Sequence, residues 1–320
     1  MNAILVDPQQ NLIWSEVPDP VPRENELLVE VHAAALNRAD LMQRAGDYPP
    51  PPGWPEWMGL EVAGIVLEAP AGGRFRRGDK VCALLGGGGY AEKVAVPADM
   101  ALPVPAGLSM AEGAAIPEAF ATSYLNLCLE GGLKAGDTVL IQAGASGLGI
   151  AAIQLAKELG ATVMTTVGSE EKARFVRAIG ADIVVNRRTD DLGEIIERHP
   201  VHIAMDCVAG AGLGAHVVKM APGGRWIVIA TLAGARTEID MNVFFRRGLK
   251  LIGSTLRSRT SEMKAQILAG LEALLWEKFA AGKIRPVIHR TLPMPTHAEE
   301  AHAILQKQEN IGKVVLTLRT

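Results

Sequence analysis

The residues with the clearest chemical meaning are three glycines, Gly144, Gly147 and Gly149, between an apolar run and a helix-forming run. A glycine turn between strand and helix leaves room for a phosphate, and the first amides of the helix are free to bind it. The spacing is a variant of the usual dinucleotide motif, and the glycines could instead serve only tight packing. A second strand expected directly after the helix favours dinucleotide binding. The residues predicted to contact the dinucleotide here are Gly144, Ser146, Gly147, Leu148 and Gly149.

The end of that second strand carries no acidic residue. A site for NADH usually places Asp or Glu about 20 residues after the turn, where it binds both ribose hydroxyls. Here Gly168 and Ser169 end the strand, Lys172 follows within one helical turn, and Arg187 and Arg188 follow the third strand. A glycine leaves room for a 2′-phosphate, a hydroxyl donates to it and cations neutralise it. We therefore predict NADPH as cofactor, although Ser169 could also cap a helix and the arginines could be solvated surface charges.

Alternating strand and helix patterns in the second half of the chain predict an α/β fold with a doubly wound parallel sheet of six strands. These strands are expected at 138–142, 162–167, 183–186, 202–206, 226–230 and 249–253, with a helix over 150–159 after the glycine turn. The chain up to about Pro105 is instead strand-rich, with a rigid proline loop at 48–53 and a flexible glycine turn at 86–90. A helical stretch over 109–129 follows it. A helix over 261–281, strands over 286–292 and 312–318 and a helix over 296–308 are expected to return to the first domain.

Composition limits the class of protein. The chain has 320 residues, is 48% hydrophobic and carries a net charge of −3, so it can form two domains with real cores and shows no sign of a nucleic-acid partner. No apolar run approaches the roughly 18 residues of a membrane helix, so we expect no membrane insertion and a cytoplasmic location. Cys82, Cys128 and Cys207 are too widely spaced to indicate a disulfide framework or a cysteine zinc site.

Several long motifs occur in one order along nearly the whole chain. They are 35–44, 49–53, Gly59-Leu60-Glu61, 114–118, the glycine turn, Asp206-Cys207, 256–259 and 310–315. In these motifs the chain resembles the zinc-free quinone oxidoreductases of the medium-chain dehydrogenase/reductase superfamily, most closely the branch that contains the p53-inducible quinone oxidoreductase. The resemblance implies a Rossmann NADPH-binding domain over 120–257 and a β-rich GroES-like catalytic domain built from 1–119 and 258–320. It also implies a homodimer formed along the strand at 249–253.

The zinc-dependent relatives in this superfamily hold a catalytic metal with a cysteine and a histidine of the first domain. Asn37 stands where the cysteine is expected, and Leu60 stands where the histidine is expected. The four-cysteine structural lobe of those enzymes is also missing. The seven histidines are expected to be structural or exposed, and we predict no metal.

Without a Lewis acid, the acceptor must already be electrophilic, as a quinone or an activated alkene is. The resemblance implies that Asn37 and Tyr48 line the nicotinamide end as catalytic residues, the amide and the phenol bonding the cofactor or a developing oxyanion. Tyr48 could supply a proton or could be a packing residue of its loop, and Asn37 could be structural. Asp40 and Arg44, one helical turn apart, are expected to pair with each other. Glu61 is expected to be a structural, buried partner in a polar network.

Further cofactor contacts are expected where parallel strands end and where the family motifs match. Lys313 could reach the cofactor or could simply be an exposed strand lysine. The residues in this group are Thr122, Cys207, Ala230, Thr231, Thr255, Leu256, Arg257 and Lys313.

The leading functional prediction is an NADPH-dependent quinone reductase that acts on a small molecule without a metal. One alternative is an NADPH-dependent reductase of enone or enal double bonds, since the same cofactor geometry serves both. Another is a low-turnover NADPH-binding redox sensor. The sequence leaves open the size of the acceptor, the strictness for NADPH over NADH, and whether electrons leave singly or as hydride.

Overall fold

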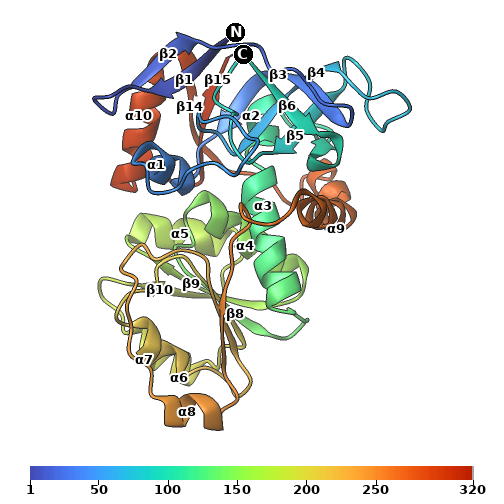
Figure 1. Ribbon diagram of the computed structural model, residues 1–320. Helices are drawn as coiled ribbons and strands as arrows, with labels where there is room; N and C mark the ends of the chain where they lie inside the picture. Colours follow the sequence, from blue (N-terminus) through green and yellow to red (C-terminus); the bar gives the residue numbers. More distant parts are fainter. Residues whose placement is uncertain (319–320) are drawn as a thin grey trace. The chain divides into compact units, whose positions relative to one another are not determined.

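The computed structural model describes residues 1–318, and its chain divides into two compact units (Figure 1). Unit 1 consists of Met1–Ala121 together with the chain from Arg257 onward, and unit 2 is the uninterrupted stretch Thr122–Leu256. Within the described residues, no helix combines the length and apolarity needed to cross a membrane.

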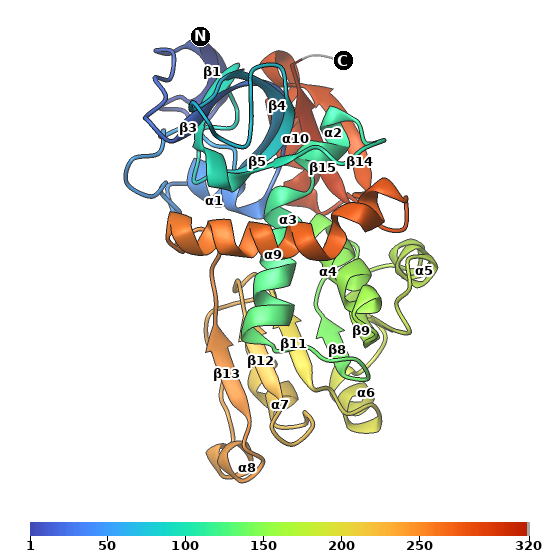
Figure 2. The same ribbon diagram turned by 90° about the vertical axis from the view of Figure 1, so that its right-hand side faces the viewer.

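Unit 2 contains a six-stranded parallel sheet in the order β10-β9-β8-β11-β12-β13, which confirms the predicted doubly wound sheet (Figure 2). The strand order reverses between β8 and β11, and in such sheets ligands bind at the carboxyl ends of the strands beside this reversal. The strands are β8 (Thr138–Ile141), β9 (Thr162–Val167), β10 (Ile183–Asn186), β11 (Ile203–Asp206), β12 (Arg225–Val228) and β13 (Lys250–Gly253).

The helices of unit 2 follow the strands, and most begin at a residue whose side chain accepts an amide of the first turn. Ser146, Ser169, Asp191 and Asp240 cap four of them in this way. One face of the sheet packs α6 and α7 against a core that includes Met164, Trp226 and Ile196. The helices are α4 (Gly147–Glu158), α5 (Glu170–Ala178), α6 (Leu192–Arg198), α7 (Leu213–Val217) and α8 (Met241–Arg246).

The helix predicted over 109–129 is interrupted, so that prediction was wrong in detail. A short α2 (Met110–Ala114) is capped by Ser109 and is followed by α3 (Pro117–Tyr124), which continues as the π-helical turn η2 (Leu125–Glu130). Pro117 explains the break, because proline has no amide hydrogen and disfavours helical backbone in the residue before it.

Unit 1 is built on a seven-stranded sheet in the order β14-β15-β3-β4-β5-β7, with β6 paired to β3. The predicted return of the chain is confirmed, since β15 pairs antiparallel with β3 through Val315 and Ala35. A separate hairpin joins β1 (Asn2–Val6) to β2 (Leu12–Glu16), and a single 3-10 turn, η1 (Ala98–Met100), precedes β7. The sheet strands are β3 (Glu26–Ala35), β4 (Glu61–Glu68), β5 (Lys80–Leu84), β6 (Lys93–Pro97), β7 (Ala101–Pro103), β14 (Ile288–Pro293) and β15 (Lys313–Thr317).

Three further helices belong to unit 1: α1 (Arg38–Arg44), α9 (Ser261–Ala280) and α10 (Met294–Lys307). α9 starts at the Thr260 cap and buries Ile267, Leu271 and Leu275, which recur at helical spacing. The glycine run 86–89, expected to be a flexible turn, is instead buried. A Cβ on Gly86 would lie 2.6 Å from the Trp54 ring, so glycine is needed there for close packing.

Candidate functional site

The glycine turn of unit 2 is shaped by contacts that a side chain would break. A Cβ on Gly144 would lie 2.0 Å from Thr165 Oγ1, and one on Gly149 would lie 2.5 Å from the Ala143 carbonyl oxygen. The Ser146 hydroxyl accepts the Gly149 amide at 3.0 Å and so caps α4. Gly147 and Leu148 occupy the first two helical positions, where an amide has no carbonyl within its own helix to bond. The turn therefore fits a phosphate of a dinucleotide.

At the end of β9 the residues predicted to recognise a 2′-phosphate gather in one place. A Cβ on Gly168 would lie 3.3 Å from Arg187 Nε, so the Arg187 guanidinium lies beside this glycine. The Ser169 hydroxyl accepts the Lys172 amide at 3.3 Å, which confirms that Ser169 caps a helix. Burial, and after it the Arg187 charge, lowers the pKa of Lys172, and Arg188 adds to the effect. Three cations thus meet where an NADH site usually has an acid.

The remaining predicted residues of unit 2 follow neighbouring strands. Thr122 lies in α3, and its carbonyl accepts the Asn126 amide at 2.7 Å. Cys207 follows β11, and burial raises the pKa of its thiol to about 12, so the thiol is not a nucleophile at neutral pH. Parallel strands end at one edge of the sheet, so the other four belong to that edge. Ala230 and Thr231 follow β12, and Thr255 and Leu256 follow β13.

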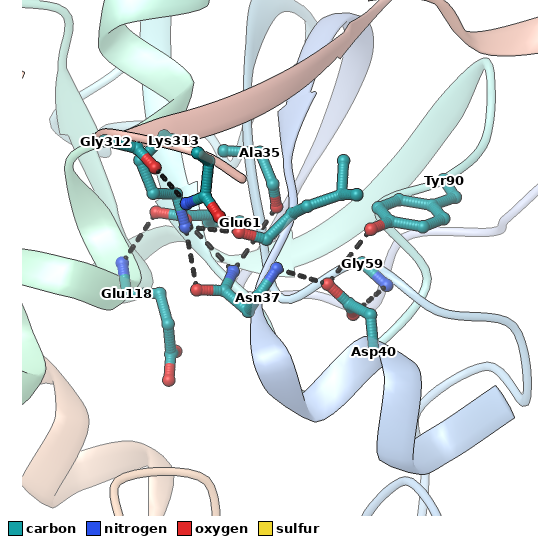
Figure 3. Close-up of polar contacts among 11 residues, drawn as sticks. Ala35, Asn37, Asp40, Gly59, Glu61, Tyr90, Glu118, Gly312 and Lys313 are labelled. Atoms are coloured by element: carbon teal, nitrogen blue, oxygen red, sulfur yellow. Dashed lines mark hydrogen bonds and ion pairs between the residues drawn. The ribbon is translucent and has the colours of Figure 1, made fainter. Parts of the chain in front are cut away.

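In unit 1 a buried polar network joins Asn37, Glu61 and Lys313 (Figure 3). The Lys313 ammonium donates to Glu61 Oε1 at 2.5 Å, to Asn37 Oδ1 at 2.8 Å and to the Leu36 carbonyl at 2.6 Å. The Asn37 amide donates to Glu61 Oε1 at 3.0 Å and to the Ala35 carbonyl at 3.3 Å. Glu61 is fully buried and Lys313 is 5% exposed. The expectation of a buried, networked Glu61 is therefore confirmed.

The same network changes the interpretation of Asn37 and Lys313. Both amide hydrogens of Asn37 and all three ammonium hydrogens of Lys313 already have acceptors within unit 1. A direct bond from either side chain to a cofactor or an oxyanion would need one of these bonds to break. The alternative of an exposed strand lysine was wrong, and direct cofactor contact by either residue stays a prediction.

Asp40 does not pair with Arg44, so that expectation was wrong. The buried carboxylate of Asp40 accepts hydrogen bonds from the Asn37 backbone amide at 2.7 Å, from the Gly59 backbone amide at 3.2 Å and from the Tyr90 hydroxyl at 3.0 Å. Arg44 instead binds Glu299 and the Gln10 carbonyl. Burial, which outweighs these hydrogen bonds, raises the pKa of Asp40 to about 6.

Arg257 and Tyr48 form a second polar group in unit 1. The Arg257 guanidinium donates to the Tyr48 carbonyl at 2.9 Å, to Gln43 Oε1 at 2.6 Å and to the buried Gly86 carbonyl at 3.0 Å. It also lies 4.6 Å from the centre of the Tyr48 ring, a cation–π contact. The side chain of Arg257 is thus committed to the proline loop and the glycine run, which leaves only its backbone for the predicted cofactor contact.

Burial raises the pKa of the Tyr48 phenol above its ordinary value; the Arg257 cation opposes this rise and the Glu118 charge adds to it. The result is a weaker acid than a free phenol. Tyr48 therefore remains suited to donating a hydrogen bond and is poorly suited to giving up a proton.

One ionisable residue of this region was not assigned a role from the sequence. The amide of Glu118, near the start of α3, donates to Glu61 Oε2 at 2.8 Å, while its carboxyl group points away from Glu61 and Lys313 (Figure 3). Burial, and after it the Glu61 charge, raises the pKa of Glu118 to about 8. The sequence signals are its place at the end of the motif 114–118 and directly after an apolar run that ends in Pro117.

Comparison with known proteins supports the assignment of both units. A family model described as an alcohol dehydrogenase GroES-like domain matches residues 23–106, and one described as a zinc-binding dehydrogenase matches residues 147–272. A quinone oxidoreductase of Sus scrofa is 32% identical over 99% of this chain and 98% of its own. The chain belongs to the quinone oxidoreductase family of the medium-chain dehydrogenase/reductase superfamily.

Two other similarities mark the range of this superfamily. The crystal structure of the quinone oxidoreductase from Thermus thermophilus, solved also as its complex with NADPH, matches with a TM-score of 0.84 and 30% identity over 99% of this chain and 100% of that one. The squalestatin tetraketide synthase of Phoma sp. is 30% identical over 95% of this chain, a region that makes up 12% of that synthase.

The zinc implied by one of the matching family models does not fit the residues present. The two positions where the resemblance expects metal ligands hold Asn37 and Leu60, and Leu60 has no donor atom. The Glu61 carboxylate beside them is already neutralised by Lys313. Within residues 1–318, no three His, Cys, Asp or Glu side chains are placed together to hold a metal ion.

Proposed function

We propose that this protein is an NADPH-dependent quinone reductase that works without a metal. The observation that carries the proposal is the match to a quinone oxidoreductase over 99% of the chain. The local chemistry agrees with it, because the positions of the zinc ligands hold an amide and an apolar side chain. An oxidoreductase without a Lewis acid requires an acceptor that is already electrophilic, and a quinone meets this requirement.

The residues of unit 2 would bind and orient the cofactor, which supplies a hydride when bound. The amides of Gly147 and Leu148 suit the pyrophosphate, while Lys172 and Arg187 suit a 2′-phosphate. In unit 1 the Tyr48 hydroxyl would hydrogen-bond the acceptor, and Asn37 would be held in place by Glu61 and Lys313. Fixed alignment of this kind can contribute several kcal/mol to lowering a barrier.

The first test is a turnover assay with chelator-treated protein, NADPH or NADH, and benzoquinone or phenanthrenequinone, read from the loss of NADPH absorbance against enzyme-free controls. Protein-dependent NADPH oxidation that survives the chelator supports the proposal. Activity that disappears with the chelator and returns with zinc contradicts metal independence.

Cofactor choice is tested by the variant Lys172→Ala. A charge-assisted contact with a phosphate contributes about 1.5–3 kcal/mol, so the Kd for NADPH should rise by about tenfold or more while the Kd for NADH stays nearly constant. Lys134→Ala, which removes a lysine of the same unit before β8, is the matched control and should change neither. Equal weakening of both cofactors would rule out a phosphate contact by Lys172.

A second candidate function is the reduction of an activated carbon–carbon double bond. It is favoured by the match to a segment of a tetraketide synthase. A panel of enones and enals compared with quinones separates the two functions by their kcat/KM values. Tight NADPH binding without oxidation by either class would favour a redox sensor instead.

We also propose that the protein forms a homodimer along β13. This strand pairs only with β12 within the described chain and lies at the edge of its sheet. Leu251 on β13 is exposed, and so are Met241 and Phe245 on α8, the helix that precedes β13 in the chain. An exposed apolar sheet edge invites pairing with a second copy.

A further inference from the structure

Glu118 combines a fixed backbone with a carboxyl group that has no assigned task. Its amide is held by Glu61, and its helix starts at Pro117, so the position of the residue is set by buried structure. The side chain is only partly exposed and extends away from the buried network (Figure 3). Throughout residues 1–318 no hydrogen bond or ion pair engages the carboxyl group itself. A carboxyl group with a structural role in a largely buried position is normally paired. The Glu118 carboxyl group is not, so it is available to bind a ligand or to transfer a proton.

The charged groups that act on Glu118 come from several elements of unit 1. Burial and two acids favour its protonated form, and two lysines oppose it. The net effect favours the protonated form. Glu118 also interacts electrostatically with both members of the Tyr48–Arg257 pair, which places the three residues in one neighbourhood. The groups that act on it are Glu61 of β4, Asp40 of α1, Lys313 of β15, Lys264 of α9, and Tyr48 and Arg257 of the loops.

A carboxyl group with a pKa of about 8 still holds its proton at neutral pH and can release it to a developing oxyanion. Tyr48, the other candidate acid in this neighbourhood, is shifted in the direction that makes it less acidic. Lys264 is not an alternative, since the residue is only 3% exposed and its ammonium donates to the Arg257 carbonyl at 2.9 Å.

We propose that Glu118 is the general acid that protonates the reduced acceptor, with Tyr48 as the neighbouring hydrogen-bond donor. This assignment rests on the proposed reductase function. In the reaction, the carbon–hydrogen bond of the reduced nicotinamide breaks, and the hydride with both electrons passes to the quinone or to the β-carbon of an enone. The acceptor is reduced, the nicotinamide is oxidised, and the oxyanion formed on the acceptor takes the proton of the Glu118 carboxyl. The resulting carboxylate recovers a proton from water.

The test compares the wild type with Glu118→Gln, which keeps the volume of the side chain and cannot release a proton. For the wild type, kcat/KM should fall as the pH rises through about 8. In the variant this limb should be absent, and kcat near neutral pH should be lower by on the order of a hundredfold. The Kd for NADPH, measured by fluorescence, should stay unchanged. Glu118→Asp should restore part of the rate together with the pH limb.

A control variant and an infrared measurement test whether the effect belongs to the Glu118 carboxyl group. Glu112→Gln, which replaces an acid in the first turn of α2, is the matched control and should behave like the wild type. In the protein without cofactor, the infrared band of a protonated carboxyl should be present at neutral pH, should disappear above about pH 8 and should be missing from Glu118→Gln.

The outcomes separate the two proposals. If the wild type turns over and Glu118→Gln keeps the same kcat and the same pH profile, the proton-donor role is overturned while the reductase function stands. If neither quinones nor enones support NADPH oxidation by the wild type, the reductase function fails first and the donor role falls with it. A missing infrared band at neutral pH would also overturn the role of Glu118.

Discussion

Two buried ionisable side chains in unit 1 change the stability of the fold with pH in opposite directions. Burial favours the neutral form of each, which is the protonated form of an acid and the deprotonated form of a base. Asp40 has a pKa of about 6, raised by burial, and His302 has a pKa of about 4, lowered by burial and by the nearby Arg44 charge. Neither ring nitrogen of His302 has a hydrogen-bond partner among residues 1–318, and its ring stands edge-on to Tyr90 at 6.0 Å. The folded protein therefore holds a neutral, unsatisfied imidazole.

We predict that His302→Phe removes part of the acid sensitivity of the fold. As the pH falls from 6.5 to about 4, the unfolded chain protonates this histidine and the folded chain does not, so stability is lost over that window. The loss amounts to on the order of 3 kcal/mol in the free energy of unfolding, at 1.36 kcal/mol per pKa unit. A phenyl ring keeps the edge contact with Tyr90 and has no proton to bind. Denaturant melts at neutral pH and near pH 4 measure the effect.

The comparison must be made as a difference between variant and wild type. Asp40 contributes stability that is fully present below pH 3.8 and is lost as the pH rises through about 6. Its effect on the change of stability with pH is therefore opposite to that of His302 in the wild type. Subtracting the two proteins removes the Asp40 contribution, which both share. An identical acid-induced loss in the variant and the wild type would contradict the prediction.

At the scale of single elements, the turn between β8 and α4 leaves no space for a side chain at Gly144. Gly144→Ala places a methyl group 2.0 Å from Thr165 Oγ1, and that hydroxyl already donates to the Ile141 carbonyl at 2.7 Å. Relief requires a shift of β9 or of the turn. We expect a loss of about 1–3 kcal/mol in the free energy of unfolding, as for other overpacked sites, together with weaker dinucleotide binding.

Thermal melts and NADPH titrations measure both effects. Gly212→Ala is the matched control in the same unit, since its Cβ would meet only the His216 ring, at 3.4 Å from Cε1 and 3.9 Å from Nδ1. Unchanged NADPH affinity in a folded Gly144→Ala variant would show that the turn tolerates the methyl group and that its shape does not govern binding.

The elements that the sequence predicts well are those with a strong local pattern. All six strands of unit 2 were placed, because apolar β-branched runs between glycine turns and helices have few other interpretations. Errors lie at the ends: β12 stops at Val228, two residues earlier than predicted. The break at Pro117 was missed although proline is a local signal, because the apolar pattern on both sides continues through it.

The site was only partly predictable because its decisive contacts are not local. The Ser146 and Ser169 caps act through their own neighbours in sequence, and their geometry follows from the pattern. The partners of Asp40 could not be read in this way, since Tyr90 and Gly59 reach it only through the folded sheet. The same holds for Glu118, whose unusual proton affinity depends on burial and on charges from β4 and β15.

At the scale of the whole molecule, the open edge of β13 leads to a prediction about assembly. Leu251→Lys should convert the proposed dimer into a monomer, because a buried, unpaired lysine in the interface opposes association. Sedimentation velocity measures the change. Leu129→Lys, at a residue of unit 2 with an exposure of 50% against 42% for Leu251, is the matched control and should leave the dimer intact. A wild type that sediments as a monomer would contradict the proposal.

The pairing of β15 with β3 has a consequence for the order in which the two units can form during synthesis. Chains leave the ribosome from the N-terminus, and domains usually complete themselves in that order. Here Lys313 bonds the carbonyl of Leu36 across 277 residues. Until Lys313 emerges, the newly made Glu61 has no cation, and the end of β3 at Ala33–Ala35 lacks its β15 partner. Unit 2, drawn from one uninterrupted stretch, can be complete by then. The part of the protein that is translated first is thus finished last. A ribosome that stalls before Lys313 would release a chain with an uncompensated carboxylate and an open sheet edge at the end of β3, both of which chaperones and proteases are suited to detect.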